Sequence, residues 1–242
     1  PEVIINKNVL YTSQLEVSKS SPDLIMVRSP VKQDRYRIIR GRSSPPGVAV
    51  MQTTTPFKPP RWVRCIVWNS KYSMDKYRSQ FGWAKNFYIP HGFDPLEFKD
   101  MDLVRNGKML AAANLYKKRS AFLGYSEWRW VADRMPGLNG LLGHGNDEPE
   151  SIGNHSLCDL VRFYNTYSVF LNTTTNSAMP RTRAEAMMCG TPIVTTNNFG
   201  IDRYLNNGIN CIIADKKEDM LRGVRRVLES KSMQEDLSKM AR

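Results

Sequence analysis

The sequence predicts an α/β protein made of two doubly wound parallel-sheet domains, of which the first is short or truncated. Short segments rich in β-branched residues recur between stretches of Ser, Pro and Gly, as buried parallel strands do. In the second half these segments alternate with helical ones across short connections, which is typical of right-handed βαβ units. A dense turn cluster at 90–95 separates the halves. The predicted domains are therefore 1–95 and 96–242, with a linker at about 92–106.

Five strands are predicted in the first domain, at 2–5, 23–27, 48–51, 64–68 and 87–89. Polar residues follow several of them, where ligand clefts form at strand carboxyl ends. These are Arg28-Ser29, Thr53-Thr54-Thr55 and Asn69-Ser70. A helix is expected over 73–81, with Gly82 ending it.

The second domain begins its pattern at Lys108. Its predicted strands lie at 109–113, 138–142, 168–171, 192–196 and 211–214. Its predicted helices lie at 125–134, 156–164, 183–189 and 217–230. This alternation favours a parallel sheet with helices on both faces.

Composition narrows the class of protein. The chain has 242 residues and a net charge of +12, which favours anionic partners such as nucleotide phosphates, lipid headgroups or nucleic acid. No apolar run approaches the roughly 18 to 20 residues of a membrane-spanning helix, and no export signal opens the chain, so we expect a cytoplasmic protein. The four cysteines, Cys65, Cys158, Cys189 and Cys211, are far apart and are expected to be buried free thiols. Neither the cysteines nor any His/Asp cluster predicts a metal site.

The most informative stretch is 176–194. Ser177 is expected to cap a helix, Pro180 suits its first turn, and Gly190 is a natural stop at its end. Arg181 and Arg183 would then lie in the first turn, where the helix dipole disfavours cations by roughly 0.3–1 kcal/mol each.

A bound anion would remove that penalty. The backbone amides around Thr182, together with two guanidinium groups, predict a diphosphate site at the start of this helix. Two solvated arginines at a frayed helix end are the alternative.

The segment 184–194 reads Ala-Glu-Ala-Met-Met-Cys-Gly-Thr-Pro-Ile-Val. It resembles the Glu-Ala-Met-small-x-Gly-x-Pro-Val-Val element of the retaining glycosyltransferases of family 4, which have the two-domain GT-B fold. Segments 67–73, 88–94, 141–145 and 208–213 resemble further elements of that family, in the family's order. The resemblance thus extends over residues 64–230.

The resemblance implies transfer of a sugar from a nucleotide-diphosphate donor held by the second domain. It implies that Glu185 binds the ribose hydroxyls, since a carboxylate accepts two hydrogen bonds from a vicinal diol. The family also has an Arg and a Lys after the first strand of this domain, both reaching the diphosphate. Here Asn114 stands in place of the Arg, and Arg119, or Lys118 one residue earlier, in place of the Lys. No further cofactor is implied.

The chain departs from the family pattern at several positions. Ser177 occupies the place of the first motif Glu, while Arg181 and Arg183 replace apolar residues. The segment 199–203 differs from the family's Gly-Gly-x-Pro-Glu, and Gln52 stands near the place of a first-domain His. We expect the added arginines to replace the cation missing at Asn114, and no catalytic residue is assigned.

The acceptor is open. The family's setting favours a lipid-linked or polysaccharide acceptor and peripheral contact with the inner membrane face, while transfer to nucleic acid is an alternative. A 2-epimerase of the same architecture is one rival, and a non-catalytic module that binds nucleic acid or an anionic surface is another. Base stacking by Arg61-Trp62 and Trp128-Arg129-Trp130 would suit that module, although the helical spacing of Trp128 and Val131 favours packing. Closure of the two domains about 90–95 is expected to exclude water.

Overall fold

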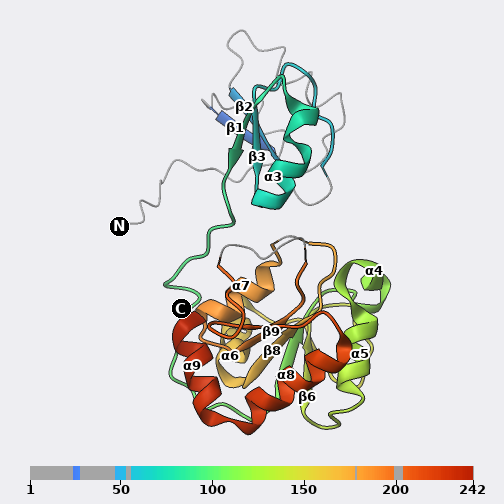
Figure 1. Cartoon of the computed structure of the whole chain (residues 1–242), viewed down its shortest axis with the longest axis vertical. Helices are drawn as coiled ribbons and strands as arrows, with labels where there is room; N and C mark the ends of the chain where they lie inside the picture. Colours follow the sequence, from blue (N-terminus) through green and yellow to red (C-terminus); the bar gives the residue numbers. More distant parts are fainter. Residues whose placement is uncertain (1–23, 28–46, 53–55, 178, 199–203, 242) are drawn as a thin grey trace. The chain divides into compact units, whose positions relative to one another are not determined.

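The computed structural model describes residues 24–27, 47–52, 56–177, 179–198 and 204–241 (Figure 1). The chain divides into two compact units, 1–89 and 90–242. The strand predicted at 2–5 and the segments 28–29, 53–55 and 199–203 lie outside the described residues.

The first unit contains a parallel sheet in the order β1-β2-β3-β4. Its strands are Leu24–Val27, Gly47–Gln52, Cys65–Trp68 and Lys85–Tyr88. Helix α3 (Lys71–Tyr77) and the 3-10 turn η1 (Arg78–Phe81) connect β3 to β4. The helix begins two residues before its predicted start because the Ser70 side chain caps it, accepting from the Ser73 amide at 3.2 Å.

A single cluster forms the described core of this unit. It contains Val50, Val63, Ile66, Trp68 and Phe81. Trp68 is fully buried, packs edge-on against Phe81 and donates from its indole nitrogen to Asn86 at 2.8 Å. The aromatic residues therefore hold α3 and η1 onto the sheet.

The second unit contains a parallel sheet of six strands in the order β10-β9-β8-β5-β6-β7. These are β5 (Met109–Ala112), β6 (Asn139–Leu142), β7 (Ser151–Gly153), β8 (Val169–Asn172), β9 (Ile193–Thr195) and β10 (Ile212–Ile213). The chain runs outward from β5 to β7, then returns to place β8 on the other side of β5. Strand order thus reverses between β5 and β8, the point at which doubly wound sheets bind ligands.

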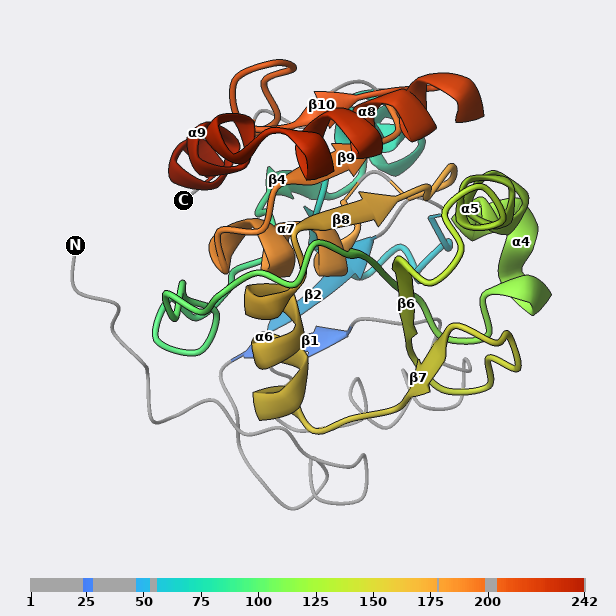
Figure 2. The ribbon, with the colours of Figure 1, turned by 90° about the horizontal axis from the view of Figure 1, so that it is seen from below.

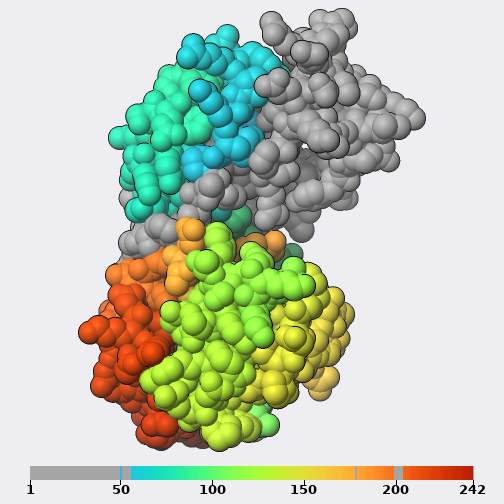
Figure 3. Space-filling model, turned by 90° about the vertical axis from the view of Figure 1, so that its right-hand side faces the viewer, coloured from blue at the N-terminus to red at the C-terminus, as the bar shows by residue number. Residues whose placement is uncertain are grey.

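Helices cover both faces of this sheet, as Figure 2 shows. One face packs against α5 (Tyr125–Ala132), α8 (Lys217–Glu229) and α9 (Lys231–Ala241). The other packs against α6 (Leu157–Thr166) and α7 (Arg181–Met188). The strands alternate between the faces, since Met109 and Ala111 join the first core and Leu110 joins the second. Figure 3 shows α5, in light green, beside the red α8.

Residues 93–105, most of the predicted linker, pack onto the second unit. Phe98 is buried in the core beneath α6 and α7. The Met101 amide donates to Asn165 Oδ1 at 2.7 Å, and Arg105 contacts the ends of both helices. This segment therefore packs as part of the second unit.

Several elements were not predicted: β7, the 3-10 turn η2 (Lys117–Arg119), α4 (Ser120–Leu123) and α9. All four cysteines are free, but Cys158 is exposed and Cys65 half-buried, so the expectation of buried thiols is wrong for these two. Among the described residues, no helix has the length and apolar composition that crossing a membrane requires.

Candidate functional site

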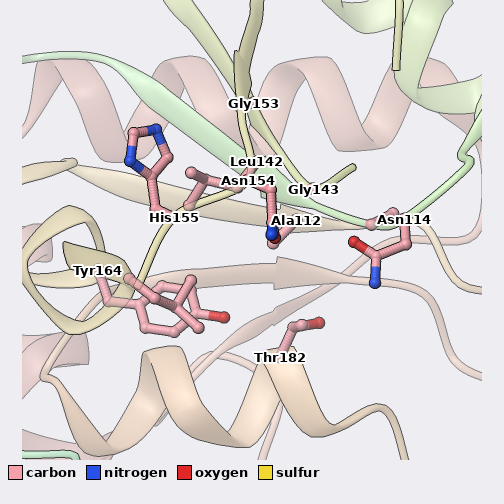
Figure 4. A pocket seen from close by; sticks show the side chains of 11 residues that line it. Ala112, Asn114, Leu142, Gly143, Gly153, Asn154, His155, Tyr164 and Thr182 are labelled. Carbon is pink, nitrogen blue, oxygen red and sulfur yellow. The ribbon is translucent and has the colours of Figure 1, made fainter. Parts of the chain in front are cut away.

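A cavity of about 220 Å³ opens at the carboxyl ends of β5, β6 and β7. It is lined by Ala112, Ala113, Asn114, Leu142, Gly143, Gly153, Asn154, His155, Leu160, Tyr164 and Thr182. Thr182 comes from α7, the helix that follows β8, so the cavity lies where the strand order reverses. In Figure 4, His155 and Tyr164 line one side and Asn114 the other, with Thr182 rising from α7.

The wall near Asn114 depends on a glycine. Gly143 has φ of +125°, and a Cβ on it would lie 2.2 Å from the Ala113 carbonyl oxygen. Glycine therefore lets the loops after β5 and β6 approach each other. Asn114 then joins them, because its Oδ1 accepts from the His144 amide at 3.1 Å.

Helix α6 supplies the opposite wall. It begins after Ser156, whose hydroxyl accepts from the Asp159 amide at 3.2 Å. Tyr164 lies near its end, fully buried and packed edge-on against Phe170. His155 precedes the helix and rests against the Phe163 ring at 4.9 Å.

Glu185 lies next to this cavity on α7 and is 6% exposed. Its Oε2 accepts a hydrogen bond from the Tyr164 hydroxyl at 3.2 Å. Its Oε1 lies 3.4 Å from Arg181 Nη2, in an i,i+4 ion pair. Arg181, Thr182 and Glu185 thus share the side of α7 near the cavity.

Burial is the largest influence on the pKa values of Glu185 and Tyr164. Desolvation raises the pKa of Glu185 above its ordinary value, while the Arg181 charge and the Tyr164 hydrogen bond act in the opposite direction. Burial, with the neighbouring Glu185 charge, also raises the pKa of Tyr164 well above its usual range. Tyr164 therefore keeps its proton and donates a hydrogen bond to the carboxylate.

The expectation that Arg183 faces the cleft is wrong. Arg183 is fully buried on another side of α7 and donates to Tyr204 Oη, Thr195 Oγ1 and Asn198 Oδ1 at 3.1–3.2 Å. Two residues along an α-helix rotate a side chain by about 200°, so Arg181 and Arg183 cannot share one face.

Ser177 does not cap α7. The N-cap position is Pro180, which offers no side-chain hydrogen bond. The Ser177 carbonyl instead accepts from Asn198 Nδ2, the residue that also contacts Arg183. Ser177 and Arg183 therefore belong to one network that supports the chain before α7.

The predicted basic residues after β5, Lys118 and Arg119, both lie in η2. Arg119 Nη1 is 3.4 Å from the Asn114 carbonyl oxygen, and its guanidinium lies over the Phe122 ring at 5.7 Å. Lys118 is exposed. Of the eight predicted site residues, Asn114 and Thr182 line the cavity. Glu185 contacts the lining residue Tyr164, Arg119 contacts the lining residue Asn114, and Arg181 contacts Glu185.

Sequence reasoning did not select Tyr164, His155, Asn154 or Leu160 as site residues. They come from α6 and from the loop between β7 and α6, where the sequence contains no motif; β7 itself was not predicted. The signal available was position alone, since polar residues after a strand lie at the sheet edge where ligands bind.

No group of three or more His, Cys, Asp or Glu side chains in the described part of the chain is arranged to hold a metal ion. Among the described residues, Arg181, Arg119 and Glu185 are charged side chains near the cavity.

Comparisons with known proteins fit this geometry. The family model described as Glycosyl transferases group 1 matches residues 144–242, which include α6, α7 and Glu185. The comparison with curated protein sequences gives no match.

Solved structures share the fold. A glycosyltransferase from Rickettsia africae superposes with a TM-score of 0.72 at 11% identity, over 94% of this chain and 73% of that one. Anabaena HepE in complex with UDP-glucose gives 0.70 at 14% identity, over 94% and 75%. TarM gives a TM-score of 0.71 at 9% identity, over 90% of this chain and 50% of that one. A complex of the S. aureus TarM protein is also among the similar structures.

The fold is therefore α/β with the two parallel sheets of the GT-B architecture. Residues 144–242 are similar to the glycosyltransferase group 1 domain. Together these findings support a glycosyltransferase enzyme.

Proposed function

We propose that this chain transfers a sugar from a nucleotide-diphosphate donor to a sugar-containing acceptor, with retention of anomeric configuration, as in family 4. The carrying observation is the cavity at the strand-order reversal, with Glu185 beside it. Support comes from the group 1 match and from neighbours such as HepE, which was solved with UDP-glucose.

In this proposal the second unit holds the donor. Glu185 accepts hydrogen bonds from the two ribose hydroxyls, and the amides at the start of α7 approach the diphosphate. The glycosyl carbon–oxygen bond breaks and the diphosphate leaves with the electron pair. The acceptor oxygen then bonds to the anomeric carbon, and its proton passes to an oxygen of the leaving diphosphate.

Arg181 and Arg119 would stabilise the charge that develops on the leaving diphosphate. Arg181 is half-exposed at the first turn of α7, so its guanidinium can reach an anion in the cavity. We propose that Arg181 offsets the cation absent at Asn114 and that the donor needs no metal ion.

The acceptor is proposed to be a lipid-linked sugar or a polysaccharide. The protein itself is proposed to be cytoplasmic, with peripheral contact to the inner membrane face. The net charge of +12 supports an anionic surface or carrier near the acceptor. Transfer to nucleic acid is the alternative that the same charge would fit.

Calorimetry and thermal shift against UDP, GDP, ADP and their sugars test the proposal. A nucleotide at 100 times its Kd should stabilise the chain by about 2.7 kcal/mol. Glu185→Gln should weaken binding at least about tenfold, because a carboxylate makes stronger hydrogen bonds to a diol than an amide does. Glu229→Gln, at the exposed end of α8, is the matched control and should bind normally.

Arg181→Ala separates binding of the diphosphate from binding of the nucleoside. It should weaken binding of the nucleoside diphosphate and leave that of the free nucleoside within about twofold, whereas Glu185→Gln should weaken both. Binding that is unaffected by Glu185→Gln would reject the site assignment, and sugar turnover without an acceptor would identify an epimerase instead.

A further inference from the structure

The Glu185 carboxylate is held from two elements. Arg181, one turn earlier on α7, lies 3.4 Å from Oε1. Tyr164, from α6, donates to Oε2 at 3.2 Å. Because Tyr164 also lines the cavity, its hydroxyl connects the cavity wall to Glu185, which is not itself a lining residue.

The backbone around Tyr164 is fixed independently of that hydrogen bond. Arg105 Nη1 donates to the carbonyl oxygens of Tyr164 at 3.2 Å and Tyr167 at 2.7 Å, and its Nη2 donates to that of Gly190 at 2.7 Å. The Thr191 hydroxyl also donates to the Tyr164 carbonyl. The end of α6 is thereby joined to the end of α7.

This scaffold sets where the Tyr164 ring lies relative to Glu185. The ring is fully buried against Phe170, so its hydroxyl has little freedom to turn elsewhere. In a poorly hydrated environment a hydrogen bond to an ionised acceptor is stronger than one between neutral groups.

We propose that Tyr164 is a positioning residue for nucleotide binding, acting through the Glu185 carboxylate rather than by hydrogen bonding to the nucleotide. This inference rests on the proposed function. The Tyr164 hydroxyl fixes Oε2, keeps the carboxylate ionised and leaves its free lone pairs for the ribose diol.

Among the described residues, the titratable and charged groups facing Glu185 are Arg181 on α7, Cys189 just after α7, Tyr164 on α6 and Glu97 in the segment before β5. Burial raises the pKa of the Cys189 thiol to about 12, so it stays neutral. Arg181 and Tyr164 favour the ionised carboxylate, while Glu97 and burial oppose it.

The test compares Tyr164→Phe with Tyr167→Phe. Both remove one hydroxyl from a largely buried tyrosine at the end of α6, and no hydrogen bond joins the Tyr167 hydroxyl to Glu185 in the described structure. Tyr164→Phe should lower nucleotide affinity about tenfold, as expected for a hydrogen bond to a charged group, with little change in the acceptor KM. Tyr167→Phe should keep the affinity within about twofold.

A double-mutant cycle then tests the route. In a Glu185→Gln background, Tyr164→Phe should cost less than about twofold, because the carboxylate it positions is gone. An equal loss in both backgrounds would show that Tyr164 acts directly on the nucleotide and would overturn the proposal.

The pH profile and a direct titration complete the design. In Tyr164→Phe the acid limb of nucleotide binding should move to higher pH, and carbon-13 NMR of the ligand-free protein should show a raised Glu185 pKa. Neither should move in Tyr167→Phe. An unmoved Glu185 pKa overturns the inference alone, whereas a wild-type chain that binds no nucleotide rejects the proposed function.

Discussion

Residues 1–89 contain 15 Lys and Arg and 5 Asp and Glu, whereas residues 90–242 contain 20 and 18. The first unit therefore carries a net charge of +10 and the second +2, which together give the +12 of the chain. The second unit contains the cavity, two core clusters and the group 1 match. The described part of the first unit has one small core.

Most of the net positive charge therefore lies in the first unit, whereas the candidate donor site lies in the second unit. The excess of cations that suggested a phosphate ligand lies mainly outside the unit that contains the cavity. Near the cavity a few placed groups, such as Arg181, must supply the charge. In the proposed function, the basic first unit would attract a large anionic acceptor or surface.

The largest expected effect is the loss of stability when the buried tryptophan in the core of either unit is replaced. Trp128 and Trp68 are both fully buried, one in each unit. Replacing either with Ala should destabilise its own unit by about 3–5 kcal/mol. Trp128→Ala should also weaken nucleotide binding, because Trp128 packs on Tyr116 in the loop after β5.

Urea denaturation followed by circular dichroism, together with calorimetry, measures both effects. Trp68→Ala serves as the control for Trp128→Ala. If Trp68→Ala weakened nucleotide binding equally, the separation of roles between the units would be contradicted.

A second change tests the glycine at the cavity. Gly143→Ala should cost about 2–4 kcal/mol, since the new Cβ would overlap the Ala113 carbonyl and φ is +125°. Gly153→Ala is matched, because Gly153 also lines the cavity at positive φ but has no atom within 4 Å of an added Cβ. Its cost should be about 1 kcal/mol. Equal costs, measured by chemical denaturation, would mean that the β5 and β6 loops are not in close approach.

A third comparison concerns the first unit's charge. Arg61, Arg64 and Lys85 are exposed around the starts of β3 and β4, and Arg222, Arg225 and Arg226 are exposed on α8. Changing either set to Glu alters net charge equally. Only the first set should weaken binding to a duplex DNA probe, roughly tenfold, and flatten its salt dependence by about 0.9 per lost phosphate contact. Equal losses in fluorescence anisotropy would show that net charge alone matters.

The smallest effect concerns an ion pair within the second unit. Glu150 bonds to Arg129 through both oxygens at 2.7 Å, and this pairing lowers the Glu150 pKa. Its contribution of about 1 kcal/mol is present above the ordinary Glu pKa and is lost as pH falls through the lowered one. Glu150→Gln should therefore reduce stability at pH 7 and have less effect near pH 3.

The control is the exposed pair Lys231–Glu235, with its charged atoms 3.8 Å apart. Glu235→Gln should leave the unfolding free energy unchanged at both pH values. A pH-independent loss in Glu150→Gln would point to packing rather than charge.

Sequence pattern predicted the second unit's sheet well because its strands are buried on both faces. β5, β6, β8 and β9 lie within two residues of their predicted bounds. Element β7 was missed because three half-buried residues carry no period. Helix α9 was missed because its packing depends on contact of Leu237 with α8 and the core, which the local sequence does not reveal.

The sequence predicted a site residue where a motif fixes its position on a helix. It did not predict which way a side chain points where packing of the helix decides this. The motif placed Glu185 beside the cavity. It could not tell that α7 turns Arg183 into the interior, where three side chains accept its donors. Tyr164 lies 21 residues before Glu185, and only the packing of α6 on α7 brings them together.

The segment before β5 limits how the second unit can be shortened. Phe98 is buried in a core, the Met101 amide bonds to Asn165, and Arg105 joins two helix ends. A fragment that starts at the first strand of this unit would lose all three. The smallest autonomous piece that keeps the cavity should therefore begin near residue 90, about twenty residues before the first strand of this unit.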